Sequence, residues 1–187
     1  MNGRSGYMFS AVTRSLEHTV HIISSKTFDS HAVLESLGTA ASICNCCNDN
    51  DTLKNALLLI CERAKTLYFR ILTAYEMSSS LHKRCCTEYY ERCILAACNA
   101  LTLFSYFPKS KKSAGEYPKT RRLALARIES TYNNAQQLRF SILSENGKIF
   151  LALPALECIY ASCNLLSSAK KLIDAYDSVY NKFTLYT

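Results

Sequence analysis

The chain has 187 residues, of which 49% are hydrophobic and 20% charged, and its formal net charge is +7. This composition excludes an extensively disordered protein, and the length suffices for a hydrophobic core without disulfide or metal staples. With only 5 glycines and 3 prolines, turn-rich sandwiches and barrels are disfavoured, and helices joined by few loops are favoured. We therefore predict a single all-α domain over residues 1–187.

Two shorter helices are predicted at the start of the chain. Apolar residues recur every three or four positions over about 10–24 and again over about 30–46, as amphipathic helices require. Asp29 or Ser30 can cap the second helix, because either side chain accepts hydrogen bonds from free amide groups. Residues 1–9, which lack this pattern, are a candidate disordered segment.

Four longer helices are predicted to follow. Pro108 ends the second of these, and Pro118 suits the first turn of the third. Similar lengths and short connections favour an up-down-up-down bundle, with the two shorter helices packed on its side or across one end. The predicted ranges of the long helices are 51–77, 81–107, 118–145 and 154–183.

Residues 138–153 also allow a different interpretation. A β-hairpin can form around Asn146-Gly147, a favoured two-residue turn. The helical stripe continues through Leu138 and Ile142 without a break, so we favour two helix ends. The apolar run 149–166 contains Glu157 and Asn164, which favours a buried helix over a transmembrane segment.

The pattern of the ten cysteines indicates whether the protein lies in a reducing or an oxidising compartment. The adjacent pairs Cys46-Cys47 and Cys85-Cys86 are poor disulfide partners, because chain neighbours do not easily reach the geometry of a bridge. Other cysteines occupy apolar helix positions, where a thiol packs as a small hydrophobic group: Cys61, Cys93, Cys98, Cys158 and Cys163. We therefore expect a reducing, cytoplasmic or otherwise intracellular location.

Much of the positive charge lies in one short segment. Residues 108–117 are predicted to form an exposed basic loop, which leads into the third long helix. Between residues 109 and 122, six basic side chains face one acid, Glu116, which gives +5 of the net +7. The six basic residues are Lys109, Lys111, Lys112, Lys119, Arg121 and Arg122. Their side chains can contact the phosphates of nucleic acid or an anionic membrane surface. The alternative is a solvated loop that binds neither.

Catalytic and metal motifs are weak. The spacing of Cys44 and Cys46 is tighter than zinc pairs usually show. His82 precedes Cys85 and Cys86 by three and four residues, but no orienting group is identifiable nearby. We predict no catalytic residue, no metal and no cofactor, and retain a cysteine-based enzyme or zinc protein as the least favoured alternative.

Tyrosine is frequent, with 12 residues, and this side chain is enriched at protein interfaces. Tyr68, Tyr90 and Tyr117 lie outside the inward stripes, which makes them aromatic interface candidates. We therefore predict a non-enzymatic adaptor or modulator that binds a protein partner, self-association included. The main alternative is a nucleic-acid-binding protein that uses the segment 109–122.

Overall fold

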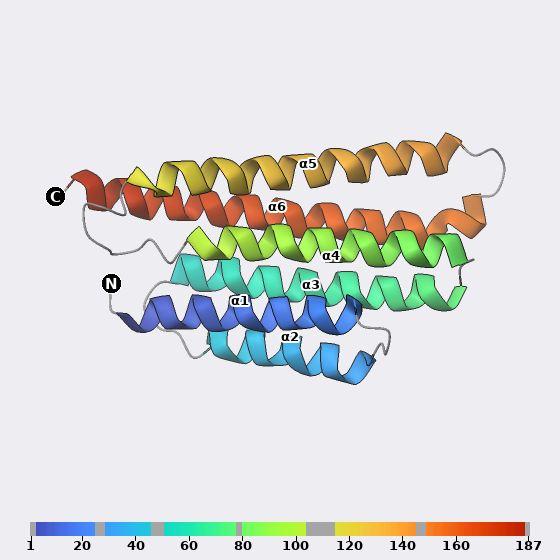
Figure 1. Cartoon of the computed structure of the whole chain (residues 1–187), viewed down its shortest axis with the longest axis horizontal. Helices are drawn as coiled ribbons and strands as arrows, with labels where there is room; N and C mark the ends of the chain where they lie inside the picture. The colour runs from blue at the N-terminus through green and yellow to red at the C-terminus, as the bar shows by residue number, and fades with distance from the viewer. Residues whose placement is uncertain are drawn as a thin grey trace.

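The computed structural model describes residues 3–24, 29–45, 51–77, 80–103, 115–144 and 149–185. These residues contain six helices and no strand, which confirms the all-α prediction (Figure 1). In chain order the helices are α1 (Gly3–Ser24), α2 (Ser30–Asn45), α3 (Asp51–Met77), α4 (Ser80–Thr102), α5 (Tyr117–Ser144) and α6 (Ile149–Leu185).

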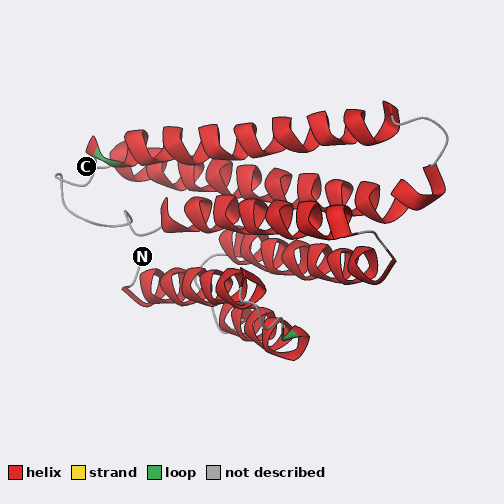
Figure 2. Ribbon diagram, turned by 45° about the vertical axis from the view of Figure 1, so that its right-hand side comes forward, coloured by secondary structure: helices red, strands yellow, loops and turns green. Residues whose placement is uncertain are grey.

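The helices run alternately in opposite directions along one long axis. In the predicted bundle, α3 and α5 occupy opposite corners and each packs on both α4 and α6. The pair α1–α2 lies beside this bundle (Figure 2). Helix α1 packs on α4, and α2 packs on α3. The up-down-up-down arrangement is therefore confirmed, and the two shorter helices cover its side. Helices α3 and α4 consequently belong to two groups of four helices.

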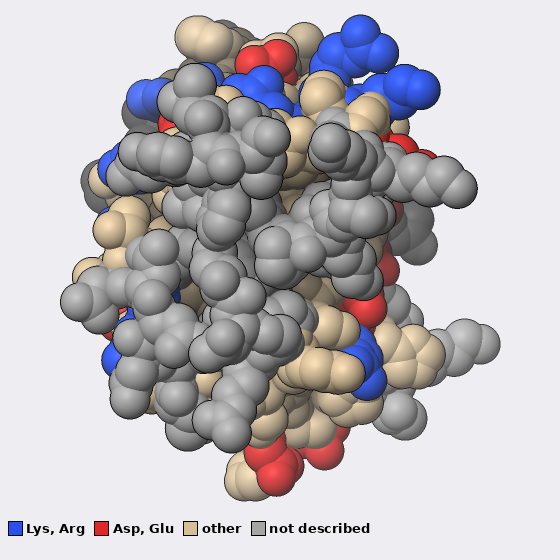
Figure 3. All heavy atoms as spheres, turned by 90° about the vertical axis from the view of Figure 1, so that its left-hand side faces the viewer, with Lys and Arg blue, Asp and Glu red and all other residues tan. Residues whose placement is uncertain are grey.

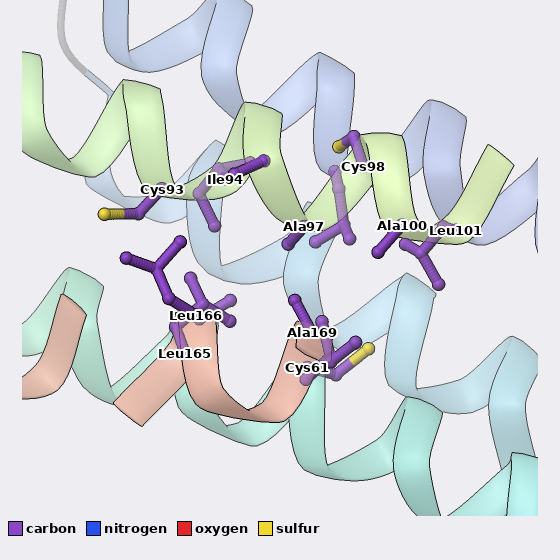
Figure 4. Packing of buried hydrophobic residues seen from close by; sticks show 14 of the residues in the cluster. Cys61, Cys93, Ile94, Ala97, Cys98, Ala100, Leu101, Leu165, Leu166 and Ala169 are labelled. Carbon is purple, nitrogen blue, oxygen red and sulfur yellow. The ribbon is translucent and has the colours of Figure 1, made fainter. Parts of the chain in front are cut away.

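One apolar cluster draws side chains from all six helices. Small residues of α4 and α6 allow the two helices to approach closely, and larger residues fill the remaining space. Figure 4 shows the two sets facing each other, Ile94, Ala97 and Leu101 from α4 and Leu165, Leu166 and Ala169 from α6. Helix α4 packs on α1, α3, α5 and α6, and α6 packs on α3, α4 and α5, so each of the two buries residues on more than one face.

Helix boundaries agree best where the sequence has strong capping signals. Helix α3 has the predicted range, and Pro118 lies in the first turn of α5 as predicted. The predicted end of α4 at residue 107 lies outside the described residues. The start of α1 was predicted seven residues too late, and the candidate disordered segment is helical from Gly3 onwards.

The predicted start of α6 at Pro154 is wrong. The helix begins at Ile149, and Pro154 lies buried inside it. A proline removes one backbone hydrogen bond, a loss that the helix tolerates so near its start. Residues 140–144 and 149–153 are helical, so the hairpin alternative is wrong for the described residues. Among those residues, no helix has a stretch long and apolar enough to cross a membrane.

Helices α1 and α2 are joined by a small, partly buried network of hydroxyl groups. Ser15 Oγ donates to the carbonyl of Ser36 at 2.6 Å, and Ser36 Oγ donates to the carbonyl of Ser15 at 2.7 Å.

Asp29 caps α2, since its Oδ1 accepts from the amides of His31 and Ala32 at 2.9 and 3.3 Å. This confirms one of the two predicted caps.

Candidate functional site

Helices α5 and α6 pair along their length in constant antiparallel register. At one end the rings of Tyr117 and Tyr180 stack with centroids 4.3 Å apart. Further along, Gln136 Nε2 lies 3.6 Å from Cys163 Sγ. As the residue number rises along α5, the number of its partner on α6 falls by nearly the same amount. This register shows which side chains of the two helices stand at the same level.

An open groove of about 920 Å³ runs between these two helices. We call it the α5–α6 groove, and it extends over Ile128–Leu143 on α5 and Leu156–Lys170 on α6. At a rise of 1.5 Å per residue, this is about 22 Å, or four helical turns. Much of its wall is apolar and is formed by Ile128, Tyr132, Leu143, Leu156, Ile159, Tyr160 and Leu166.

Three large side chains of this wall are exposed to solvent. The exposed fractions are 41% for Tyr132, 46% for Leu143 and 71% for Tyr160. Helix α5 packs mainly on α4 and α6, so none of the other described helices covers the outer side of this pair. Clustered exposed apolar side chains beside a groove are typical of an interaction site.

The polar side chains of the α5–α6 groove are unevenly placed. By the register, Glu129 and Lys170 stand at the same level, so their charges partly cancel. Arg139 stands near the level of Tyr160, where none of the described lining residues is acidic. Burial raises the pKa of the Cys163 thiol, and the Gln136 hydrogen bond and the Arg139 charge only partly oppose that rise. Cys163 is therefore a neutral thiol in the groove wall at neutral pH.

A second, smaller groove of about 430 Å³ lies between α3 and α6. It shares Leu156, Tyr160 and Asn164 with the α5–α6 groove, so these residues form a ridge between the two. An ion pair of 2.8 Å between Arg70 and Glu157 crosses the second groove. Because both side chains are about half exposed, the pair contributes at most about 1 kcal/mol to stability.

The three tyrosines predicted to form an interface are buried. Tyr68 and Tyr90 are 0% exposed and Tyr117 is 2% exposed, so none is available on the surface of this chain. The prediction assumed one inward stripe per helix. Helix α3 packs on α2, α4 and α6, so its buried face is wider than one stripe and includes Tyr68.

The basic segment is only partly described. Lys109, Lys111 and Lys112 lie outside the described residues, whereas Lys119 and Arg122 are exposed at the start of α5. Figure 3 looks onto this end of the bundle, and Lys and Arg side chains gather along its upper edge, where α5 begins.

Arg121 is engaged within the fold. Its Nε lies 2.7 Å from both carboxylate oxygens of Asp177. Tyr117 Oη donates to the same carboxylate at 3.0 Å. These contacts clamp the start of α5 to α6, and the hydrogen bonds to Asp177 raise the pKa of Arg121. Arg121 is therefore less available to a phosphate than Lys119 or Arg122.

The described cysteines are mostly core residues. Cys61, Cys93, Cys98 and Cys158 are buried as their positions predicted, and Cys163 is half-buried. Cys44 is also buried, with its Sγ 3.9 Å from that of Cys61. Cys46, Cys47 and the side chains of His82, Cys85 and Cys86 lie outside the described residues. In the described part of the chain, no three potential metal ligands gather.

Comparison with known proteins identifies no relative. No protein-family model, curated protein or solved structure matches the chain.

Proposed function

We propose that this chain is a non-enzymatic helical-bundle protein that binds a protein partner through the α5–α6 groove. The observation that carries this proposal is the exposure of Tyr132, Leu143 and Tyr160 along one continuous groove. Removing apolar surface from water gains about 25 cal/mol per Å². A partner that covers these three side chains therefore gains free energy that the isolated chain leaves unused.

The side chains of the groove support binding rather than catalysis. The thiol of Cys163 is hydrogen-bonded to the amide of Gln136, which is neither an acid nor a base. A nucleophile is activated by an adjacent base, by a lowered pKa or by a metal, whereas burial raises the pKa of Cys163 and no group of potential metal ligands is found among the described residues. Among the described residues lining the groove, Glu129 is the only carboxylate, and the register places it about two turns of α5 from the level of Cys163.

The proposal includes an intracellular, reducing compartment. Cys44, Cys61, Cys93, Cys98 and Cys158 are buried in the apolar core, where they pack as small hydrophobic side chains. This use of cysteine supports a compartment in which thiols stay reduced, because secreted domains usually commit their cysteines to disulfides.

Site-specific photo-crosslinking in the native host cell tests the proposal. A benzophenone side chain at position 160 lies in the groove, whereas the same group at position 95 replaces an exposed leucine of α4 outside it. We expect a discrete protein adduct from position 160 and none from position 95. The captured protein, once purified, should bind the wild-type chain and lose about tenfold in affinity for Leu143→Lys. Identical adducts from both positions, or none from position 160, would contradict the proposal.

A second candidate function is nucleic-acid binding through the basic segment. It is favoured by the exposure of Lys119 and Arg122 at the end of the bundle where α5 begins. If each contacts a phosphate, replacing both by alanine should lower affinity for duplex DNA or RNA. The slope of log K against log salt should also fall by about two. Leu143→Lys serves as the control that leaves this binding unchanged.

A further inference from the structure

We infer that the α5–α6 groove receives an acidic amphipathic helix of about four turns, supplied by the partner protein. This inference depends on the proposed function and specifies its partner. Three features of the groove support this inference. The backbone groups of its walls are already hydrogen-bonded within helices, its apolar side chains are spaced by whole helical turns, and its polar side chains carry charge.

Both walls of the groove are helices. Their backbone amide and carbonyl groups are used in intrahelical hydrogen bonds, so the groove offers no edge to which an extended strand could add. A segment bound there must satisfy its own backbone, as a helix does. Helix-in-groove recognition then depends on apolar side chains at about i, i+4, i+7 and i+11 of the bound segment.

The apolar side chains of the groove fit that periodicity. Tyr132 and Leu143 stand three turns apart on α5, and Leu156 and Tyr160 stand one turn apart on α6. The register places Leu143 near the level of Leu156, so one end of the groove is apolar on both walls. A helix of about 15 residues, roughly 22 Å long, spans the groove from this end to Ile128 and Lys170.

The charge of the groove favours an acidic occupant. Of the described residues that line the groove, two are cations, Arg139 and Lys170, and one is an acid, Glu129. By the register, Glu129 and Lys170 stand at the same level at one end, whereas Arg139 stands near the level of the exposed ring of Tyr160. A carboxylate on the bound helix would pair with Arg139. A second copy of this chain is disfavoured, because its net charge of +7 is repelled by an equal charge.

The test selects ligands without assuming their sequence. A displayed library of 16-residue segments, randomised on a helical scaffold, is selected on the purified full chain. We expect enrichment of net acidic segments with apolar side chains at i, i+4, i+7 and i+11. An enriched peptide, synthesised and labelled, should bind about tenfold more weakly to Arg139→Glu than to wild type. It should also protect Cys163, which lies in the groove wall, from alkylation.

Arg127→Glu is the matched control, because Arg127 is exposed on the same helix but does not line the groove. It should leave peptide affinity within about twofold of wild type. Arg139→Gln, which removes the charge without reversing it, should give an intermediate loss, and circular dichroism verifies that each variant is folded.

Several outcomes would overturn the inference. These are enrichment of neutral or basic segments, equal losses for Arg127→Glu and Arg139→Glu, failure to enrich any helix, and concentration-dependent self-association that Tyr160→Lys abolishes. If position 160 still crosslinks a partner protein, these outcomes reject the acidic helix but not the proposed function. If position 160 captures no protein, the proposed function itself fails.

Discussion

Replacing Tyr68 by alanine is expected to lower the free energy of unfolding by about 3–5 kcal/mol, the range for removing a large aromatic side chain from a core. Tyr68 is fully buried, and its ring lies 6.3 Å from that of Tyr90 at an interplanar angle of 59°. Such tilted aromatic pairs add to the stability gained from burial alone. Urea denaturation followed by circular dichroism measures the change.

The neighbouring residue provides the control for this prediction. Phe69 is 44% exposed, so Phe69→Ala should cost less than about 1 kcal/mol. The two variants also distinguish a core role for Tyr68 from the interface role that its position in the sequence indicated. If Tyr68→Ala were as stable as Phe69→Ala, the buried position of Tyr68 would be wrong.

The sequence predicted the elements of the fold well where local chemistry sets them. Helix α3 begins and ends where polar residues flank an apolar stripe, and Asp29 caps α2 as one of two expected candidates. The start of α6 was wrongly predicted at Pro154 because proline favours the first turn of a helix. The apolar residues before Pro154 are also helical, and the helix begins at Ile149. The start of α1 was missed because residues 1–9 carry no clear stripe.

The α5–α6 groove could not be predicted, because it depends on which helices lack a neighbour. The apolar stripe of α5 continues through Tyr132, Leu138 and Ile142, so the sequence indicates burial along the whole helix. In the structure Tyr132 is exposed and the other two are only half-buried. Helix α3 lies at the opposite corner of the bundle and does not cover this part of α5. The apolar stripe of α5 is longer than the core that can cover it. Periodicity reveals the stripe but not how much of it the other helices cover.

The arrangement of the helices also explains why the three tyrosines predicted to lie at an interface are all buried. A side chain off the main stripe is exposed on a helix with one neighbour and buried on a helix with several. Tyr68 lies on α3 and Tyr90 on α4, which both belong to two groups of four helices, and both residues are buried. Tyr160, on the outer face of α6, is exposed. Exposure therefore follows from the arrangement of the helices more than from the residue type.

Raising the pH above about 9 is expected to destabilise the protein strongly. Burial raises the pKa of both Cys93 and Cys98 from 9.0 to about 12. Between these values the unfolded chain loses the thiol protons and the folded chain keeps them. The stability that depends on these protons is therefore complete below pH 9 and is lost as the pH rises towards 12. Each thiol should contribute roughly 1 kcal/mol per pH unit to this loss.

Urea denaturation at pH 7, 9, 10 and 11, with reductant present throughout, measures this dependence. We expect the free energy of unfolding to be nearly constant up to pH 9 and then to fall by roughly 2–3 kcal/mol per pH unit. The buried hydroxyl of Tyr90, whose pKa burial also raises, acts in the same direction above about pH 10 and makes the fall steeper there than the two thiols alone would.

Cys93→Ala and Cys98→Ala separate the thiols from other alkaline effects. Each variant should be somewhat less stable at pH 7, because a smaller side chain leaves a cavity. Above pH 9, however, its stability should fall less steeply than that of wild type, by roughly 1 kcal/mol per pH unit for each thiol removed. Cys163→Ala should change the slope least, because Cys163 is only half-buried in the groove wall. If the double variant at positions 93 and 98 retained the wild-type slope, ionisation of these two thiols would not cause the alkaline loss of stability.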